Sequence, residues 1–332
     1  MVAIRALAAL LLAVPLQGLA QTAEPVRTIE IAASRIVNFR LGSAQTDFGA
    51  LEFVGGLQLS ASDKDFGGLS GLRLLDDRSA FVAVSDEGFW FAGRLQRDSG
   101  GALAGVEAVS AGPLGAPRGK LPLPKREIDC EGIAVAGPFA YLSYERNHRI
   151  ERVALVAGRP SGRPQPIVAR GRISGLANNQ GLEALAAFPP GSARAGSLIA
   201  IAEESLDAAG NSRAFIVSGG GVSEFSVLRS DDFSPTDADF LPGGDLLLLE
   251  RHFSLKRGPL MRIRRIAAAD LAPGRIATGE TLLVADAAYR IDNMEGIAVS
   301  EGADGSVHVA LVSDDNFSPL QSTLLLEFRL RP

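Results

Sequence analysis

The sequence has a single cysteine, Cys130, and only three histidines among its 332 residues. One cysteine excludes an internal disulfide, a zinc–thiolate site and an iron–sulfur cluster, because each of these needs several thiolates. The histidines His148, His252 and His308 leave little for a histidine-rich metal site. Lysine is scarce, and 38 acidic residues against 33 basic ones give a formal net charge of −5. This balance argues against a nucleic-acid partner, since such domains are usually basic.

Apolar residues make up 46% of the chain and charged residues 21%, a composition typical of a compact globular protein rather than a disordered one. The 37 glycines and 18 prolines are spread throughout and indicate many tight turns. A chain of this length buries a core large enough to fold without disulfides.

The N-terminal 20 residues have the three-part layout of a secretory signal peptide. Arg5 precedes an apolar run over residues 6–16, and the small-residue ending Gly18-Leu19-Ala20 follows. The run is shorter than the ~20 residues that span a bilayer, and no later segment is long and apolar enough to do so. No cysteine follows it, which excludes a lipoprotein anchor; the alternative is a buried N-terminal helix. We expect cleavage and a periplasmic or secreted protein, and a single cysteine fits a bacterial periplasm.

A short phrase recurs five times at spacings of roughly 50–60 residues. Its copies are Gly68–Leu72, Glu131–Val135, Gly181–Leu185, Thr236–Phe240 and Glu295–Val299. Each copy is followed by a turn and by a second apolar run that ends in an acidic residue. Short apolar runs between strong turns predict strands. About four such strands per repeat predict an all-β fold, a β-propeller with five blades.

Two features bear on how the ring is built. The last repeat ends one strand short after Thr323–Leu330, and Leu51–Leu59, before the first repeat, has the pattern to supply the missing strand. We therefore expect a ring closed by strands from both ends of the chain. This divides the sequence into a signal peptide at 1–20, an N-terminal segment at 21–47 and one propeller domain at 48–332. The strand-like Ile36–Leu41 leaves a sixth blade open, and a solenoid is the alternative architecture.

In each repeat, the first strand begins near the phrase, and its antiparallel partner ends at an acidic residue. The start of one strand and the end of its antiparallel partner lie at the same edge of a sheet, so acids of the phrase and acids at the end of the second strand reach that edge together. The expected acids are Asp86, Glu87, Glu131, Glu145, Glu183, Glu203, Glu204, Asp239, Glu250, Glu295, Asp314 and Asp315. Bare carboxylates at one funnel mouth repel each other and need cations, protons or arginines. Basic residues placed to help are Lys125, Arg126, Arg146 and Arg251, together with His148 and His252. The alternative is that the acids cap turns and pair locally with arginines.

Oxygen ligands at this density suit Ca²⁺, which takes six to eight of them. No EF-hand spacing occurs, so the ligands would come from separate blades. The expected ligands are Asp86, Glu131, Glu183, Glu203, Glu295 and Asp314. The expected catalytic residues are Arg146 and Arg251, which would bind anionic oxygens, Glu145 or Glu250 as general base, and His252.

The sequence resembles the bacterial phytase-like family, also described by an esterase-like activity, whose members are exported. The motifs that carry the resemblance are Asp129–Ala134, Asn179–Ala184, Asn293–Ala298, and Ser313–Phe317 with Gln321, and the resemblance covers about Phe66–Phe328. It implies a propeller that hydrolyses phosphoesters or carboxyl esters, with calcium as a cofactor. The histidine-phosphatase motif is absent, so that mechanism is not implied.

We therefore expect a monomeric, exported hydrolase whose partner is a small anionic or ester substrate. One alternative is a metal-dependent lactonase of the gluconolactonase type. Another is a propeller that binds or scaffolds without catalysis, because a fold does not determine a function.

The signal-peptide interpretation predicts that protein recovered from the periplasm begins at or near Gln21. N-terminal sequencing or intact-mass measurement of that fraction checks this. Recovery of chains that still begin at Met1 would contradict export by cleavage.

Overall fold

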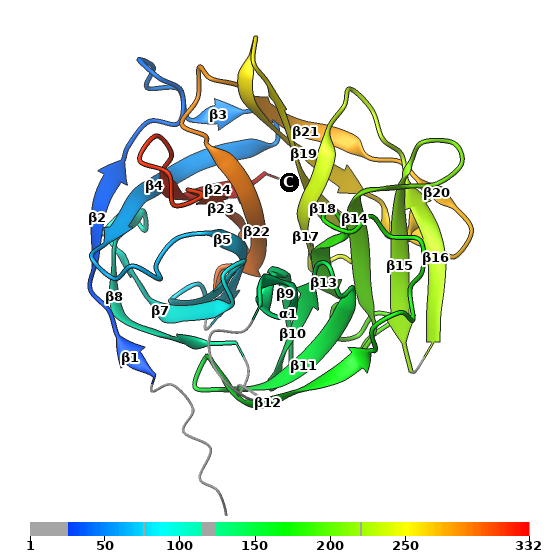
Figure 1. The fold of residues 1–332 in the computed structure, drawn as a ribbon. Helices are drawn as coiled ribbons and strands as arrows, with labels where there is room; N and C mark the ends of the chain where they lie inside the picture. The colour runs from blue at the N-terminus through cyan, green and yellow to red at the C-terminus, as the bar shows by residue number, and fades with distance from the viewer. Residues whose placement is uncertain (1–25, 76, 115–123, 220, 332) are drawn as a thin grey trace, which may run out of the picture.

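The computed structural model describes residues 26–331, apart from residues 76, 115–123 and 220. The predicted signal peptide lies outside the described residues. Five β-sheets are arranged around a central axis, which confirms the predicted five-bladed, all-β propeller (Figure 1). Helical structure in the described residues is limited to α1 (Lys125–Ile128) and the 3₁₀ turn η1 (Ala268–Asp270). Neither has the length to cross a bilayer, and no helix in the described part of the chain is a membrane span.

From the axis outward, the first sheet consists of β5 (Leu69–Leu75), β6 (Ala80–Ser85), β7 (Phe89–Arg97), β8 (Leu103–Pro113) and β1 (Arg27–Thr28). In the same order, the second consists of β9 (Cys130–Ala136), β10 (Phe139–Tyr144), β11 (Arg149–Val156) and β12 (Arg159–Val168). The third consists of β13 (Leu182–Ala187), β14 (Leu198–Leu206), β15 (Ser212–Ser218), β16 (Gly221–Val227) and β20 (Ile276–Ala277). The fourth consists of β17 (Ser234–Phe240), β18 (Leu246–Ser254), β19 (Gly258–Ile266) and β21 (Glu280–Ala285). The fifth consists of β22 (Asn293–Glu301), β23 (Val307–Asp314), β24 (Thr323–Leu330), β4 (Leu51–Ala61) and β2 (Ile31–Ile36), with β3 (Asp47–Phe48) beside β4.

The fifth sheet combines strands from both ends of the described chain. β24 pairs antiparallel with β4, with Thr323 opposite Leu59 and Leu330 opposite Leu51, as the sequence predicts. β2 lies outside β4 in the same sheet. The strand-like segment at 36–41 does not start a sixth blade: only Ile36 belongs to a strand, and Arg40 makes an isolated bridge to Tyr289.

The five innermost strands, β5, β9, β13, β17 and β22, contact one another in this order, and β22 contacts β5. Five clusters of buried apolar side chains fill the gaps between adjacent sheets. Between the first two sheets, for example, Val82 and Val84 of β6 pack with Ile133 of β9 and Leu142 of β10. The short apolar runs of the repeat therefore have hydrophobic residues on both faces, because each blade is covered on both sides.

Every inner strand has a β-bulge at the same point of the repeated phrase. The register to the second strand skips one residue in each sheet, and the skipped residues are Ser70, Glu131, Glu183, Thr236 and Glu295. Such a bulge redirects the extra residue out of the regular alternation of the strand. The glycine that follows two of the glutamates allows close contact with the next blade. A Cβ on Gly132 would lie 2.4 Å from the carbonyl oxygen of Glu183, and one on Gly296 would lie 3.1 Å from the backbone nitrogen of Leu72.

Deeper on the axis, a buried arginine of β5 connects four of the five inner strands. The Arg73 guanidinium donates hydrogen bonds to the backbone carbonyls of Leu72 (β5), Leu185 (β13), Ala238 (β17) and Ile297 (β22). It also forms an ion pair with Asp237 of β17, with an Nη1–Oδ2 distance of 2.8 Å.

The pairing of β24 with β4 predicts that removing residues 322–332 abolishes cooperative folding. The deletion would leave β23 and β4 with unpaired edges and remove the buried Leu326 and Phe328 from the core. Deleting only the last two residues is the control, because that change leaves β24 intact. Thermal unfolding followed by circular dichroism compares the two; an unchanged melting transition in the longer deletion would contradict this role of β24.

Candidate functional site

A cavity of about 260 Å³ lies at the end of the propeller where the inner strands begin and the second strands end. Its lining is almost entirely polar and comes from all five sheets. The lining residues are Ser70, Asp86, Lys125, Asp129, Glu131, Glu145, Arg146, Asn179, Glu183, Glu203, Arg251, Asn293, Glu295, Asp314 and Asn316. Eight of these are carboxylates and three are cations.

The carboxylates reach the cavity in two ways. Glu131, Glu183 and Glu295 are the bulge residues of their inner strands. Four other acids, Asp86, Glu145, Glu203 and Asp314, stand within or just after the end of a second strand. All six predicted metal ligands, together with Glu145, Arg146 and Arg251, therefore line one cavity.

The two remaining bulge residues carry hydroxyl groups that bond to the neighbouring blade. The Ser70 hydroxyl donates to the carbonyl oxygen of Cys130 at 2.6 Å. The Thr236 hydroxyl donates to the carbonyl oxygen of Met294 at 3.2 Å. These acceptors precede the bulge glutamates Glu131 and Glu295 along the chain. Hydroxyls therefore join blades at two positions of this ring, and carboxylates occupy the other three.

The three cations of the cavity pair with four of its carboxylates. Lys125 Nζ lies 2.6 Å from Asp86 and 3.4 Å from Asp129, and Arg146 also pairs with Asp129. Arg251 lies 2.9 Å from Glu203 and 3.2 Å from Glu295.

Four carboxylates of the cavity form no ion pair with any described residue: Glu131, Glu145, Glu183 and Asp314. In addition, Asp86 Oδ1 is buried without a hydrogen-bond partner among the described residues. Within the described part of the chain, the cavity therefore contains more negative charge than its own cations balance.

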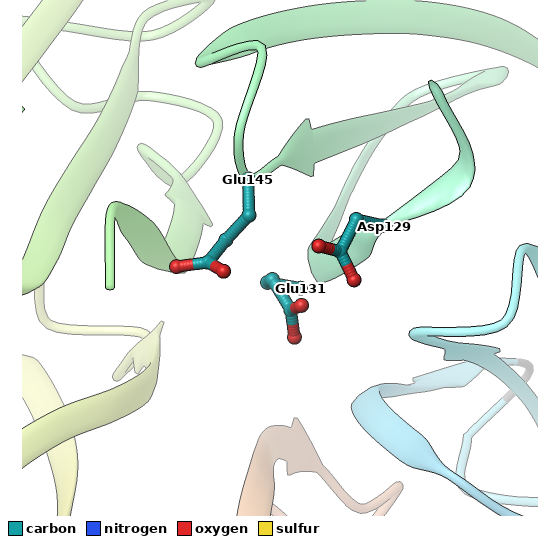
Figure 2. A group of neighbouring side chains, drawn as sticks. All are labelled: Asp129, Glu131 and Glu145. Atoms are coloured by element: carbon teal, nitrogen blue, oxygen red, sulfur yellow. The ribbon is translucent and has the colours of Figure 1, made fainter. Parts of the chain in front are cut away.

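Asp129, Glu131 and Glu145 form the tightest group (Figure 2). One potential ligand atom from each lies within 4.8 Å of the other two, a spacing that would let one metal ion contact all three. In Figure 2 the three carboxylates face a shared space between the second sheet and its neighbours. Asp129 belongs to one of the family motifs but was not among the predicted ligands. Its position two residues before Glu131 was the available signal.

Glu145 is held in place by a tight loop. Its Oε1 accepts a hydrogen bond of 2.6 Å from the backbone N–H of Gly181. The residues after it adopt left-handed backbone conformations, with φ of 54° at Arg146 and 38° at His148. A Cβ on Gly181 would lie only 2.4 Å from the His148 ring, so a larger residue at this position would displace that side chain.

Burial and repulsion between neighbouring acids raise the pKa values of several cavity carboxylates. Burial, with the charges of nearby acids adding to it, raises the pKa values of Glu131 and Glu183 well above the usual range. Burial raises the pKa of Glu295 to about 8 although Arg251 opposes the shift, and raises that of Asp314 to about 7. The group therefore retains protons at neutral pH unless another cation replaces them.

Two predicted catalytic residues do not line this cavity. Glu250 is buried between two arginines of β19, at 2.7 Å from Arg262 and 2.6 Å from Arg264, so its charge is balanced there. His252 lines a second, neighbouring cavity.

Several expected mouth acids also serve other parts of the fold. Asp239 accepts hydrogen bonds from the backbone N–H groups of Phe240 and Val299, deeper on the axis. Glu204 pairs with Arg229. Asp315 accepts hydrogen bonds from the Gly68 and Phe317 backbones.

Fold and site together define a five-bladed propeller with a carboxylate-rich cavity on its axis. The family model for phytase-like proteins, described as "esterase-like activity of phytase", matches residues 64–317. The chain belongs to this phytase-like family. No protein with a curated description matches the sequence.

Solved propellers share the arrangement only loosely. The PQQ-bound aldose sugar dehydrogenase of Streptomyces coelicolor is 14% identical, with a TM-score of 0.43 over 90% of this chain and 98% of its own. A gluconolactonase of Xanthomonas campestris is 12% identical, with a TM-score of 0.41 over 93% of this chain and 99% of its own. At these scores the likeness supports no assignment of activity.

The raised pKa values predict that, in the presence of a chelator, the protein loses stability as the pH rises from about 4.5 to 8. Glu295 has a pKa of about 8 in the folded protein against 4.5 for the free group, so the folded state binds more protons across this interval. The contribution of the bound proton to stability is fully present below pH 4.5 and is lost as the pH passes 8. Glu295→Gln should flatten the curve, as measured by thermal unfolding at a series of pH values. A wild-type stability that rises across this interval would contradict the assignment.

Proposed function

We propose that the protein is a Ca²⁺-dependent hydrolase that cleaves a phosphoester or a carboxyl ester in the axial cavity. The observation that carries the proposal is the excess of carboxylates over cations in this cavity: four of the eight carboxylates form no ion pair with any described residue, and Asp86 Oδ1 is buried without a hydrogen-bond partner among them. Membership of a family described by esterase-like activity supports the same class of reaction.

The donor set fits a calcium ion. Ca²⁺ prefers six to eight hard oxygen ligands at flexible geometry, and the cavity presents carboxylate and amide oxygens from several blades. Asp129 and Glu131 would hold the ion, with Glu183, Glu295, Asp86, Glu203 and Asp314 around them and Glu145 beside it. A bound Ca²⁺ would polarise the ester's oxygen and make a water molecule more acidic.

The protein's own residues supply positioning and charge. Arg251 comes from the fourth sheet and pairs with Glu203 and Glu295, and Arg146 follows the second strand of the second sheet and pairs with Asp129. A guanidinium held in this way can donate further hydrogen bonds to the anionic oxygens of an ester.

Glu145 would act as the general base. One of its oxygens is fixed by the Gly181 N–H, which leaves the other to accept a proton from water. Glu250, the other base expected from the sequence, is already bonded to Arg262 and Arg264 and has no role in this scheme.

We also propose that the protein acts outside the cytoplasm after removal of residues 1–20. A calcium site fits such a setting, because exported proteins meet calcium at concentrations that weaker sites can bind.

Calcium should raise the melting temperature of the wild-type protein, because a ligand that binds only the folded state stabilises it. At 100 times Kd the gain is ~2.7 kcal/mol, or a few degrees for a chain of this size. Glu131→Gln keeps the shape of the side chain but removes its charge, and should reduce both the calcium shift and hydrolysis. Glu280→Gln, at an exposed position of β21, is the matched control and should change neither. Calorimetry with calcium and with chelator measures the shift.

Hydrolysis of p-nitrophenyl phosphate, p-nitrophenyl acetate and a lactone under the same two conditions separates the candidate activities. If Glu131→Gln instead stabilises the protein and wild type shows no calcium shift, the carboxylates form a structural ring and the proposal fails.

A further inference from the structure

A second, larger cavity of about 550 Å³ adjoins the carboxylate-lined one. Arg251, Asn293 and Asn316 line both, so the two spaces share one boundary. The remaining lining residues of the second cavity are His252, Phe253, Pro259, Leu260, Ile291, Asp292, Ser318, Leu320 and Gln321. Its volume lies within the ~300–1,000 Å³ typical of small-molecule sites.

The walls of this second cavity are mainly apolar and come from three segments. The hairpin of β18 and β19 contributes Phe253 and its cross-strand partner Pro259, together with Leu260. The segment before β22 contributes Ile291, and the loop between β23 and β24 contributes Leu320. The side chain of Phe253 is 64% exposed and that of Leu320 is 93% exposed. Large apolar side chains gathered and exposed beside a cavity are a mark of a binding surface.

The loop that presents Leu320 is held against the segment before β22. Asp292 accepts hydrogen bonds from the Gln321 side chain at 3.0 Å and from the Ser322 backbone at 2.9 Å. Asn316 donates to the Gln321 side-chain oxygen at 3.2 Å. Polar contacts of neighbouring residues therefore fix the position of this loop. None of these contacts involves Leu320, which is exposed on the loop.

The charges of the second cavity are already engaged. Arg251 pairs with Glu203 and Glu295, and Asp292 holds the loop. His252 makes a 3.1 Å contact between Nδ1 and the carbonyl oxygen of Asp232. Within the described part of the chain, this cavity therefore offers no unpaired lysine or arginine for additional phosphate groups.

The geometry points to a substrate subsite in the second cavity that takes the alkyl chain on the acyl side of the ester. This rests on the proposed function and deepens it: the reacting group would lie by Arg251 in the carboxylate-lined cavity, and the apolar group would lie between Phe253 and Leu320. The substrate class is then a small ester with one apolar group, and a polyanion with several phosphates fits this subsite poorly.

The test compares p-nitrophenyl hexanoate with p-nitrophenyl acetate in the presence of calcium. Each methylene that enters an apolar site gains up to about fourfold in kcat/KM, so the hexanoate should be favoured by at least about tenfold. Phe253→Ser with Leu320→Ser should remove most of that preference by lowering kcat/KM for the hexanoate. Leu255→Ser is the matched control, because Leu255 is 98% exposed on the same hairpin and does not line the cavity. An equal preference in wild type and double variant would overturn the subsite.

A binding measurement keeps the subsite separate from the proposed hydrolysis. Calorimetric titration with hexylphosphonate and methylphosphonate requires no turnover, and the hexyl compound should bind at least about tenfold more tightly to wild type but not to the double variant. If the hexyl compound binds more tightly but no ester is hydrolysed, the subsite is supported and the proposed hydrolase activity is wrong. If esters are hydrolysed at rates that do not depend on chain length, the hydrolase activity is supported and the subsite is wrong. Equal binding of the two phosphonates, or binding of neither, overturns the subsite.

Discussion

The buried ion pair between Arg73 and Asp237 fixes the centre of the molecule. Through it, one side chain of the first blade binds backbone carbonyls of three other blades, at the level where no regular strand pairing crosses the axis. Asp237 also accepts a hydrogen bond of 2.9 Å from the Ile297 backbone N–H. Burial raises the pKa of Asp237 to about 6 despite the guanidinium beside it, which shows how strongly this site is removed from water. Removing one partner of such a pair typically costs about 3–5 kcal/mol, because the other charge is left buried and alone.

Charged side chains lie at two levels along the propeller axis, and the two levels differ in their balance of cations and anions. The deeper layer contains Arg73 with Asp237, and Asp239 lies 3.8 Å from Arg73, so that cation and anions lie together. The outer layer contains the bulge glutamates, where anions predominate. In the deeper layer the protein supplies Arg73 and backbone N–H groups to the two aspartates, whereas in the outer layer carboxylates outnumber cations. This division is the physical basis for placing function at one end of the propeller.

The repeat predicted the blade number, the pairing of β24 with β4 and the convergence of the acids, because all three follow from short-range strand pattern and antiparallel geometry. It placed Glu250 and Asp239 at the mouth by the same rule, and there it was wrong. The fourth copy of the phrase has Thr236 where three of the others have glutamate, and its acids stand one and three residues later. Long-range partners decide where such acids end: Arg262 and Arg264 for Glu250, and the Val299 backbone for Asp239. Nothing local in the sequence shows that Arg73 faces Asp237 across 164 positions of chain.

The contacts between adjacent blades at the five bulge positions are not all of the same kind. At the level of the cavity, Ser70 ties the first blade to the second, and Thr236 ties the fourth to the fifth. The strength of these hydroxyl hydrogen bonds does not depend on pH or on the concentration of dissolved ions, because the hydroxyl groups do not ionise. The third blade has a glutamate at the seam on each side, Glu131 before it and Glu183 after it. Near its mouth the propeller therefore consists of two pairs of blades, each joined by a hydroxyl hydrogen bond at a bulge, and a third blade with a glutamate at the bulge position of the seam on either side.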